Sequence, residues 1–290
     1  CGNSSTGVQI INVNDNIPPV IIAPPSVTGI QCGGEIPPHY NSASEFIAAG
    51  GSLSDNCTGN GNIVTLTFVS ESITPGNCPN SYIVTRLYKA TDACGNTSTA
   101  QHVINVSDTT PPAITAPAPV TVVCASDVPA PNISLVTVSD NCSNNNEVTV
   151  VFVNDVIYNQ ECAHQYTISR TYKAIDECGN FATATQMITV NDNVPPVIVS
   201  PPNITGVQCS SDVPAPYANL SQFIAAGGEA TDNCSGTVVI TLFGESIVPG
   251  DCANRYVLTR VYQAMDVCGN TATATQTITV AICQNIQLST

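Results

Sequence analysis

The sequence has no tryptophan, and only 9% of its 290 residues are charged. A disordered chain shows low hydrophobicity with high charge, whereas 43% of these residues are hydrophobic. The sequence also has no apolar run near the roughly 20 residues that a helix needs to cross a bilayer. We therefore expect a folded protein that does not insert into a membrane.

Basic residues are scarce. Six Lys and Arg stand against 21 Asp and Glu, which gives a formal net charge of -15. Such a chain repels nucleic acid and anionic membrane surfaces. The same charge is compatible with bound divalent cations.

Catalytic motifs are missing as well. The sequence contains no Gly-x-Ser-x-Gly, no P-loop and no His-Glu-x-x-His. The three histidines, His39, His102 and His164, fall at unrelated positions of the repeats described below. Repetition also argues against a single active site. We expect neither an enzyme nor an organic cofactor.

Cysteine is abundant but never forms a Cys-x-x-Cys pair. The 14 cysteines are well separated, which argues against zinc ribbons and thioredoxin-type redox sites. Many spaced cysteines are typical of proteins in an oxidising compartment. The sequence therefore predicts a secreted, extracellular or cell-surface protein held by disulfide bonds.

Three short strings recur in one fixed order. Asp-x-Cys-Gly-Asn spans 92–96, 176–180 and 266–270, and Asp-Asn-Cys spans 55–57, 140–142 and 232–234. The third string is an Asp separated by two residues from Pro-Pro, and it begins at Asp15, Asp108 and Asp192. This periodicity indicates tandem modules. We divide the chain into repeat 1 at residues 14–106, repeat 2 at 107–190 and repeat 3 at 191–280.

The flanking segments match parts of a repeat. From Cys94 to Val106 is 12 positions, and the same interval separates Cys1 from Val13. Residues 1–13 therefore match the last strand of a preceding repeat. Residues 281–290 lack the Asp and Pro-Pro string, and we interpret them as the start of a following repeat of another subtype.

Each repeat has the pattern of β structure. Segments such as 148–152 and 166–172 are rich in β-branched and aromatic residues, and Gly-Asn suits positive φ in a hairpin. The sequence predicts an all-β chain of tandem immunoglobulin-like β-sandwich domains, each with two disulfides, arranged end to end. We expect Phe68, Phe152 and Phe243 to fill the space of the missing core tryptophan.

The predicted sandwich suggests a disulfide pairing. Its strand order places the first and third cysteines of a repeat at one end and the second and fourth at the other. Four cysteines allow three connectivities, and this arrangement favours pairing inside each repeat. The predicted bonds are Cys32–Cys78, Cys57–Cys94, Cys124–Cys162, Cys142–Cys178, Cys209–Cys252 and Cys234–Cys268. Each would close a loop of about 40 residues, worth roughly 4 kcal/mol in the chain-entropy model.

Half of the basic residues recur at one position of the repeats. Arg86, Arg170 and Arg260 lie on an alternating strand, and an acidic residue stands 15 positions before each of them. An antiparallel hairpin would bring the two together. We predict three structural ion pairs, with an anion-binding arginine as the alternative reading. The pairs are Arg86–Glu71, Arg170–Asp155 and Arg260–Glu245.

Motifs in repeat 2 resemble those of a known module. Asp-Thr-Thr-Pro-Pro at 108–112, Asp-Asn-Cys-Ser at 140–143, Tyr-Thr-Ile-Ser-Arg-Thr-Tyr at 166–172 and Asp-Glu-Cys-Gly-Asn at 176–180 resemble the hyaline-repeat-like, immunoglobulin-fold modules of very large Bacteroidota surface proteins. These proteins include gliding-motility adhesins exported by type IX secretion. The resemblance implies surface display with adhesive or filament-forming roles. Asp108-Thr109-Thr110 resembles the O-glycosylation motif of Bacteroidota, with Thr109 as the acceptor.

The linker at 14–19 is similar to the calcium-binding linkers of cadherins. Calcium takes six to eight oxygen ligands from carboxylates, amides and carbonyls. Three aspartates of each repeat lie in the linker and in two loops that flank it. The alternative is that they accept backbone hydrogen bonds in Asx-turns. The candidate calcium ligands are Asp15, Asp55, Asp92, Asp108, Asp140, Asp176, Asp192, Asp232 and Asp266.

Two functions fit these observations. The first is a stalk or spacer segment of a long secreted bacterial cell-surface adhesin or extracellular filament, whose partners are neighbouring repeats of the same chain and other copies in a filament. The second is an adhesive module that binds surface glycans or a protein. A subunit of a strand-exchanged fibre, using residues 1–13, is a third idea. The related segments 46–50 and 223–227 are read as core cover or as contacts between chains.

Overall fold

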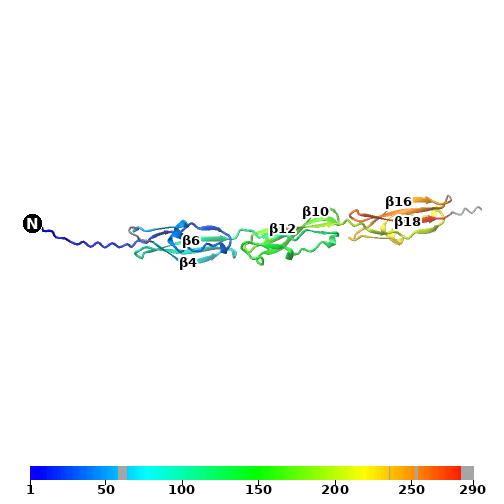
Figure 1. Ribbon diagram of the computed structural model, residues 1–290. Coiled ribbons are helices and arrows are strands. Elements are labelled where there is room, and N and C mark those ends of the chain that lie inside the picture. The colour runs from blue at the N-terminus through cyan, green and yellow to red at the C-terminus, as the bar shows by residue number, and fades with distance from the viewer. Residues whose placement is uncertain (58–63, 235, 252–253, 282–290) are drawn as a thin grey trace, which may run out of the picture. The chain divides into compact units, whose positions relative to one another are not determined.

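The computed structural model describes residues 1–57, 64–234, 236–251 and 254–281. Figure 1 shows an all-β chain of three tandem β-sandwich-like domains, which confirms the predicted class. Contacts divide the chain into two compact units, and the division passes across repeat 2. One unit is Cys1–Thr115, Thr137–Val151 and Lys173–Thr183, and the other is Ala116–Val136, Phe152–Tyr172 and Ala184–Thr290.

Repeat 1 pairs a four-stranded sheet with a two-stranded sheet. The large sheet has the order β2-β6-β5-β4, in which β2 runs parallel to β6 and the other pairs are antiparallel. The small sheet is the antiparallel pair β1-β3. The strands are β1 Val20–Ile22, β2 Val27–Ile30, β3 Ser52–Ser54, β4 Thr65–Pro75, β5 Ser81–Thr91 and β6 Thr97–Ser107.

Repeats 2 and 3 have the same sheet orders. In repeat 2 they are β10-β11-β12-β8 and β7-β9, and in repeat 3 they are β14-β18-β17-β16 and β13-β15. The strands of repeat 2 are β7 Ala113–Thr115, β8 Val120–Val122, β9 Thr137–Ser139, β10 Thr149–Cys162, β11 Gln165–Ile175 and β12 Phe181–Asn191. Those of repeat 3 are β13 Val197–Val199, β14 Ile204–Val207, β15 Glu229–Thr231, β16 Val239–Pro249, β17 Tyr256–Met265 and β18 Thr271–Val280.

The central strand of each large sheet alternates strictly between inner and outer faces. In β5, Val84, Arg86, Tyr88 and Ala90 are buried and the residues between them are more exposed. A period of two places every second side chain on one face. The buried tyrosine hydroxyl is also satisfied, because Tyr88 Oη accepts a hydrogen bond from the backbone N–H of Tyr40 at 3.1 Å.

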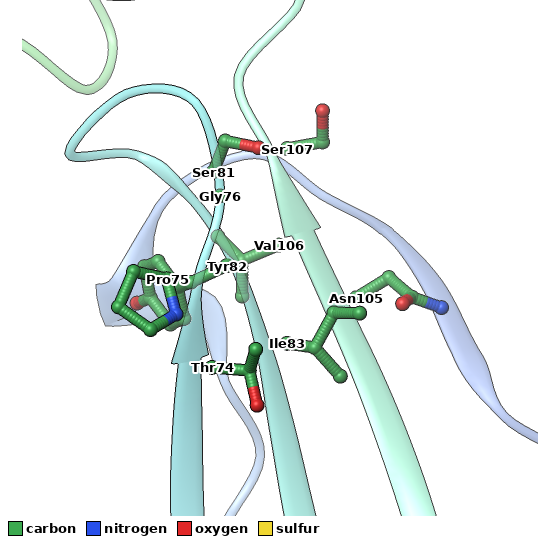
Figure 2. A pocket seen from close by; sticks show the side chains of 9 residues that line it. All are labelled: Thr74, Pro75, Gly76, Ser81, Tyr82, Ile83, Asn105, Val106 and Ser107. Carbon is green, nitrogen blue, oxygen red and sulfur yellow. The ribbon is translucent and has the colours of Figure 1, made fainter.

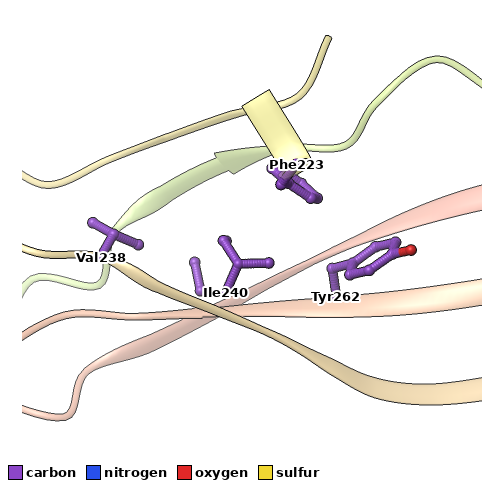
Figure 3. Close-up of a cluster of buried hydrophobic side chains, with 5 residues drawn as sticks. Phe223, Val238, Ile240 and Tyr262 are labelled. Carbon is purple, nitrogen blue, oxygen red and sulfur yellow. The ribbon is translucent and has the colours of Figure 1, made fainter. Parts of the chain in front are cut away.

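Two short helices each supply a large aromatic side chain to the cores of repeats 1 and 3. Helix α1 is Ala43–Ala48 and helix α2 is Leu220–Ala225, and they bury Phe46 and Phe223 completely. Figure 3 shows Phe223 in one buried cluster with Val238, Ile240 and Tyr262 in the core of repeat 3. The phenylalanines of these segments therefore cover the core, whereas Ile47 and Ile224 beside them are each 51% exposed.

These helices also correct the prediction about the missing tryptophan. Phe243 is 66% exposed and Phe152 is 40% exposed, so neither fills a core. Phe243 lies where the register of β16 and β17 shifts between Leu242 and Gly244, and a bulge leaves the extra residue unpaired. Phe68 stacks on His39 and meets the edge of Tyr88. In repeats 1 and 3 the fully buried phenylalanine comes from the helix instead.

Four single-turn 3-10 helices complete the described elements. They are η1 Gly33–Glu35, η2 Ala125–Asp127, η3 Ile133–Leu135 and η4 Ser210–Asp212. Three of them begin directly after the first cysteine of a repeat, at Cys32, Cys124 and Cys209. Among the described residues, no helix is long and apolar enough to cross a membrane.

Candidate functional site: the repeat junctions

Disulfide bonds join consecutive repeats. The first cysteine of one repeat bonds to the second cysteine of the next, and the third bonds to the fourth in the same way. Repeats 1 and 2 are joined by Cys32–Cys142 and Cys78–Cys178, and repeats 2 and 3 by Cys124–Cys234 and Cys162–Cys268. Their Cα–Cα distances of 5.0–5.2 Å lie in the ordinary disulfide range.

This connectivity corrects the predicted pairing inside each repeat. None of Cys32–Cys78, Cys124–Cys162, Cys142–Cys178 and Cys234–Cys268 forms, and Cys94 has a free thiol rather than a bond to Cys57. Cysteines do gather at the predicted ends, because both Cys32 and Cys78 bond to repeat 2. At each end they bond to the adjoining repeat rather than to each other. The predicted Cys209–Cys252 bond involves Cys252, which lies outside the described residues.

A second set of contacts accompanies each third-cysteine bond. The backbone N–H of Asp108 donates to the carbonyl of Asn80 at 3.0 Å, and that of Asp192 donates to the carbonyl of His164 at 2.9 Å. Each carbonyl belongs to the residue two positions after the bonded cysteine, Cys78 or Cys162. The linker aspartate and the disulfide thus anchor the same loop of the preceding repeat.

In repeats 2 and 3, the asparagine of the Asp-Asn-Cys string contacts the other disulfide of the junction. Asn141 Nδ2 lies 2.9 Å from Cys142 Sγ and 3.4 Å from Cys32 Sγ. Asn233 Nδ2 lies 3.0 Å from Cys234 Sγ and 3.5 Å from Cys124 Sγ. Our sequence reasoning missed these residues, although the constant asparagine before the second cysteine was a visible signal.

The Asp-x-Cys-Gly-Asn string forms a hairpin that is hydrogen-bonded to the linker. Asp176 Oδ1 accepts backbone hydrogen bonds from Cys178 and Asn180, both at 2.8 Å, and Gly179 has φ 86°. Asn180 Nδ2 donates to Asp176 Oδ2 at 2.8 Å and to the carbonyl of Asp108 at 3.1 Å. The equivalent bonds recur at Asp92 and at Asp266.

The hydrogen bonds of this hairpin stabilise the ionised form of its aspartate. Burial works to raise the pKa of Asp92, but the hydrogen bonds from Asn96, Cys94 and Gly95 outweigh it, so the pKa of Asp92 is lowered. Asp92, Asp176 and Asp266 therefore follow the Asx-turn reading, since both carboxylate oxygens of each already accept bonds.

The other two aspartates of each junction differ, because each leaves one buried oxygen without a hydrogen bond. Asp108 Oδ1 accepts from the backbone of Thr110 at 3.2 Å, and Asp140 Oδ1 accepts from Cys142 and Ser143. No partner among the described residues meets Asp108 Oδ2 or Asp140 Oδ2. The equivalent oxygens at the other linkers are Asp55 Oδ1, Asp192 Oδ2 and Asp232 Oδ1.

These acidic groups converge. One ligand atom each of Asp108, Asp140 and Asp176 lies within 4.8 Å of the others, and the same limit holds for the cluster of Asp192, Asp232 and Cys234 and for that of Asp15, Asp55 and Cys57. Cys234 is bonded to Cys124, so the oxygens of Asp192 and Asp232 are the donors of its cluster. Asp266 is not part of that cluster.

Converging buried carboxylates are unfavourable unless something neutralises them. Asp108 is only 5% exposed and Asp192 only 3%. Burial raises the pKa of Asp108, and the negative charges of Asp140 and Asp176 raise it further. The hydrogen bond from the Thr110 backbone lowers this pKa but does not outweigh them. Orphaned oxygens on like-charged neighbours are the donor set of a hard cation such as calcium. The residues present therefore fit a cation site.

The chain is similar to hyalin. It is 29% identical to hyalin of Lytechinus variegatus over 287 residues, which cover 96% of this chain and 50% of that protein. The chain thus spans half the length of this relative. No protein-family model matches the chain.

Solved cadherin structures also match, at low identity. Domains EC3–6 of protocadherin gammaB7 in a cis-dimer structure are 14% identical, with 90% of this chain and 77% of that chain covered and a TM-score of 0.32. Domains EC1–4 of Drosophila N-cadherin are 13% identical, with 93% and 76% covered and a TM-score of 0.28.

The three predicted arginine–acid pairs meet on the large sheets, away from the junction aspartates. Arg86 Nε lies 2.7 Å from Glu71, Arg260 Nε lies 2.6 Å from Glu245, and Arg170 contacts both oxygens of Asp155 at 2.9 Å. The arginine side chains are 4–5% exposed. Each arginine already has its acid, so none is an open anion site.

His102 stands where the other repeats have glutamine. Gln186 and Gln276 donate through Nε2 to backbone carbonyls at 2.9 Å, and His102 Nε2 lies 3.2 Å from the carbonyl of Pro25. His102 is 1% exposed, and its Nδ1 has no partner among the described residues. Burial lowers the pKa of His102, and the charge of Arg86 adds to this against the bond to Pro25.

A pH dependence follows from His102. Because its folded pKa lies below the unfolded value of about 6.5, the unfolded chain binds the proton more tightly. Stability is therefore full above about pH 6.5 and falls with decreasing pH, by up to about 1.4 kcal/mol per pH unit. We expect His102→Gln to keep the bond to Pro25 and to be more stable than wild type at pH 5 but not at pH 7.5. Denaturant unfolding at both pH values measures this, and an equal effect at the two would contradict it.

A shallow pocket lies on the large sheet of repeat 1. Figure 2 shows its lining, which comes from β4, β5 and β6 and from Gly76. The nine residues include Thr74, Ser81, Tyr82 and Ser107 but no aspartate, glutamate, histidine, lysine or cysteine. The hydroxyls here therefore have no base beside them within the lining, and the pocket offers no pair for nucleophilic catalysis.

Thr109 is exposed at the first junction. Its backbone N–H donates to Gln31 Oε1 at 2.8 Å, and its Oγ1 lies 3.3 Å from Gln31 Nε2. The hydroxyl predicted to carry a glycan is therefore engaged with the preceding repeat. Glycosylation of Thr109 stays a prediction.

Proposed function

We propose that this chain is a structural spacer of a long extracellular protein, built so that each repeat is covalently braced to the next. The observation that carries the proposal is the connectivity of the four disulfides whose two cysteines both lie in the described part of the chain, because each of them joins one repeat to the next. Disulfides persist in oxidising compartments, which supports secretion. The similarity to hyalin over 96% of the chain supports an adhesive or structural extracellular role.

The spacer fits a secreted cell-surface adhesin or a filament. Neighbouring repeats of the same chain are its direct partners, because both disulfides of each junction bind them. Display on a Bacteroidota cell, gliding motility, type IX secretion and glycan binding rest on the sequence motifs alone and stay predictions. The mechanical test is the extension of the oxidised chain under load, measured with optical tweezers.

We also propose that calcium binds at the junctions. Asp108 and Asp140 would hold it in the first junction, and Asp192 and Asp232 in the second, each pair through oxygens that accept no hydrogen bond. Bound calcium supplies the positive charge that these buried carboxylates lack. Without the ion, the linker and the Asp-Asn-Cys loop repel each other beside the disulfide that joins them to the preceding repeat.

Calcium is therefore expected to stabilise the chain. Extracellular calcium modules bind with Kd near 10⁻⁴–10⁻³ M. At a free concentration about 100 times Kd, binding adds about 2.7 kcal/mol, or a Tm rise of about 15 °C for a domain of this size. Calorimetry with calcium and with excess chelator measures the difference.

Two variants sharpen the calcium experiment. Asp140→Asn is expected to lose most of the response of the first junction, whereas Glu177→Gln removes one exposed charge from a loop of the same junction and should keep it. A Tm that is the same in calcium and in chelator would refute the cation site and leave the disulfide-braced spacer standing.

A further inference from the structure

In repeats 2 and 3, the linker aspartate and the Asp-x-Cys-Gly-Asn hairpin form the face that contacts the preceding repeat. Repeat 1 has the same face. Cys94 occupies the position of Cys178 and Cys268 in the Asp-x-Cys-Gly-Asn hairpin. Those two cysteines are bonded to the third cysteine of the preceding repeat, whereas Cys94 is exposed and has a free thiol. The hairpin around Cys94 is already formed.

The surroundings of Cys94 match those of its bonded equivalents. Asn96 Nδ2 donates to the carbonyl of Asp15 at 3.2 Å, as Asn180 does to Asp108 and Asn270 to Asp192, both at 3.1 Å. Gly95 has φ 90°, close to the 86° of Gly179 and the 88° of Gly269. The hairpin around Cys94 therefore already has the conformation of the hairpins whose cysteines are bonded.

A second group on this face also lacks its counterpart. The backbone N–H of Asp108 and that of Asp192 each donate to a carbonyl two residues after the third cysteine of the preceding repeat. Within the described residues, the backbone N–H of Asp15 meets no such acceptor. Cys94 and Asp15 together therefore fit a loop that offers a cysteine and, two residues later, a free carbonyl.

We propose that this face docks the end of another repeat of the same type and that Cys94 forms a disulfide with that repeat's third cysteine. We commit to the repeat whose last strand is residues 1–13, in the same polypeptide. Ile11 and Val13 match Ile104 and Val106, which are almost fully buried in β6, yet they are 72% and 91% exposed here. Their pattern is that of a core strand, and the chain leads directly from it to Asp15.

The bond forms by thiol–disulfide exchange with a low-molecular-weight disulfide such as oxidised glutathione. One thiolate attacks the reagent and forms a mixed disulfide, releasing one glutathione thiolate. The second protein thiolate then displaces the second glutathione. The two protein thiols lose two protons and two electrons in total, and the reagent becomes two reduced glutathiones.

The test is alkylation of the whole secreted protein before and after reduction, followed by peptide mass spectrometry. Cys94 is expected to be unreactive before reduction and linked to a cysteine that is the third of another repeat. In Cys94→Ser, that cysteine should become reactive. Cys178→Ser is the matched control, because it should expose Cys78 in the same way.

Three results would count against the proposal in different ways. An alkylated Cys94 beside intact Cys78–Cys178 and Cys162–Cys268 bonds would overturn it and leave the spacer function standing. A reducible link between two copies of the chain, seen as a doubled mass on a non-reducing gel, would overturn the assignment to the same polypeptide. Free thiols at all of these positions would contradict the proposed function itself. The inference rests on that function, because a disulfide at Cys94 requires the same oxidising compartment.

Discussion

Reduction of the disulfides is expected to lengthen the fully stretched chain by about 700 Å. In the oxidised chain a covalent path runs from Cys32 across its bond to Cys142, along 20 residues (162 minus 142) to Cys162, and across to Cys268. At about 3.5 Å per residue this path reaches only about 80 Å. Without disulfides the same ends are 236 residues apart (268 minus 32), or about 800 Å.

Optical tweezers with handles at the two chain ends measure this change, because the segments outside Cys32 and Cys268 contribute equally in both states. Pairing inside each repeat would give a different number. Its shortest path contains 46 residues from Cys78 to Cys124, 47 from Cys162 to Cys209 and 16 from Cys252 to Cys268, or about 400 Å. An oxidised chain that stretches that far would contradict the connectivity of the junctions.

A double variant serves as an internal control. With Cys32→Ser and Cys142→Ser, the shortest path runs 46 residues from position 32 to Cys78 and crosses to Cys178. It then runs 16 residues back to Cys162 and crosses to Cys268. That path reaches about 230 Å, so the oxidised variant should extend about 150 Å further than wild type. An unchanged limit would show that the first bond carries none of the load.

Asp155→Ala is expected to destabilise the chain by about 3–5 kcal/mol. Arg170 is 4% exposed, and its Nε and Nη2 each donate to one oxygen of Asp155 at 2.9 Å, while Nη1 donates to the carbonyl of Pro129 at 2.7 Å. Donating hydrogen bonds to the Asp155 carboxylate raises the pKa of Arg170, which therefore stays charged. Removing the acid leaves this buried charge without its partner. Chemical denaturation of the transition that contains repeat 2 gives the free energy.

The chain provides its own control for this effect. Arg255 and Asp251 form a pair at 3.2 Å in which both side chains are mostly exposed. Exposed pairs contribute about 0–1 kcal/mol, so Asp251→Ala should change stability little. A double variant, Arg170→Met with Asp155→Leu, should recover most of the loss because no charge is left buried. Equal costs at Asp155 and Asp251 would show that burial of Arg170 adds nothing.

The sequence predicted the local chemistry of the sheets well, because that chemistry repeats at constant intervals. An acid 15 positions before each of Arg86, Arg170 and Arg260 implied an antiparallel hairpin, and these side chains meet across neighbouring strands. The left-handed glycine of each Asp-x-Cys-Gly-Asn hairpin followed from residue type. The alternating strand predicted around Arg86 is β5, which buries every second side chain on one face.

The disulfide partners could not be predicted in the same way. Every repeat offers cysteines at the same four positions, so no pattern distinguishes Cys78 bonded to Cys32 from Cys78 bonded to Cys178. Only the position of the next repeat decides. The six-residue helices were missed because α1 and α2 are too short to show a helical period, and the core role of Phe46 and Phe223 was left undecided between two readings.

The candidate calcium ligands were predicted as one class of nine aspartates, and the structure separates them by hydrogen bonding. Asp92, Asp176 and Asp266 use both oxygens in the hairpin and its contact with asparagine. Asp108, Asp140, Asp192 and Asp232 each leave a buried oxygen unbonded. Sequence alone lacks this information, because it depends on which backbone N–H groups point at each carboxylate.

Non-reducing peptide mapping of the secreted protein tests the central claim most directly. If consecutive repeats are braced to each other, the peptide that contains Cys178 will be linked to the one that contains Cys78, and Cys268 will be linked to Cys162. Recovery of Cys178 linked to Cys142, within repeat 2, would contradict the account.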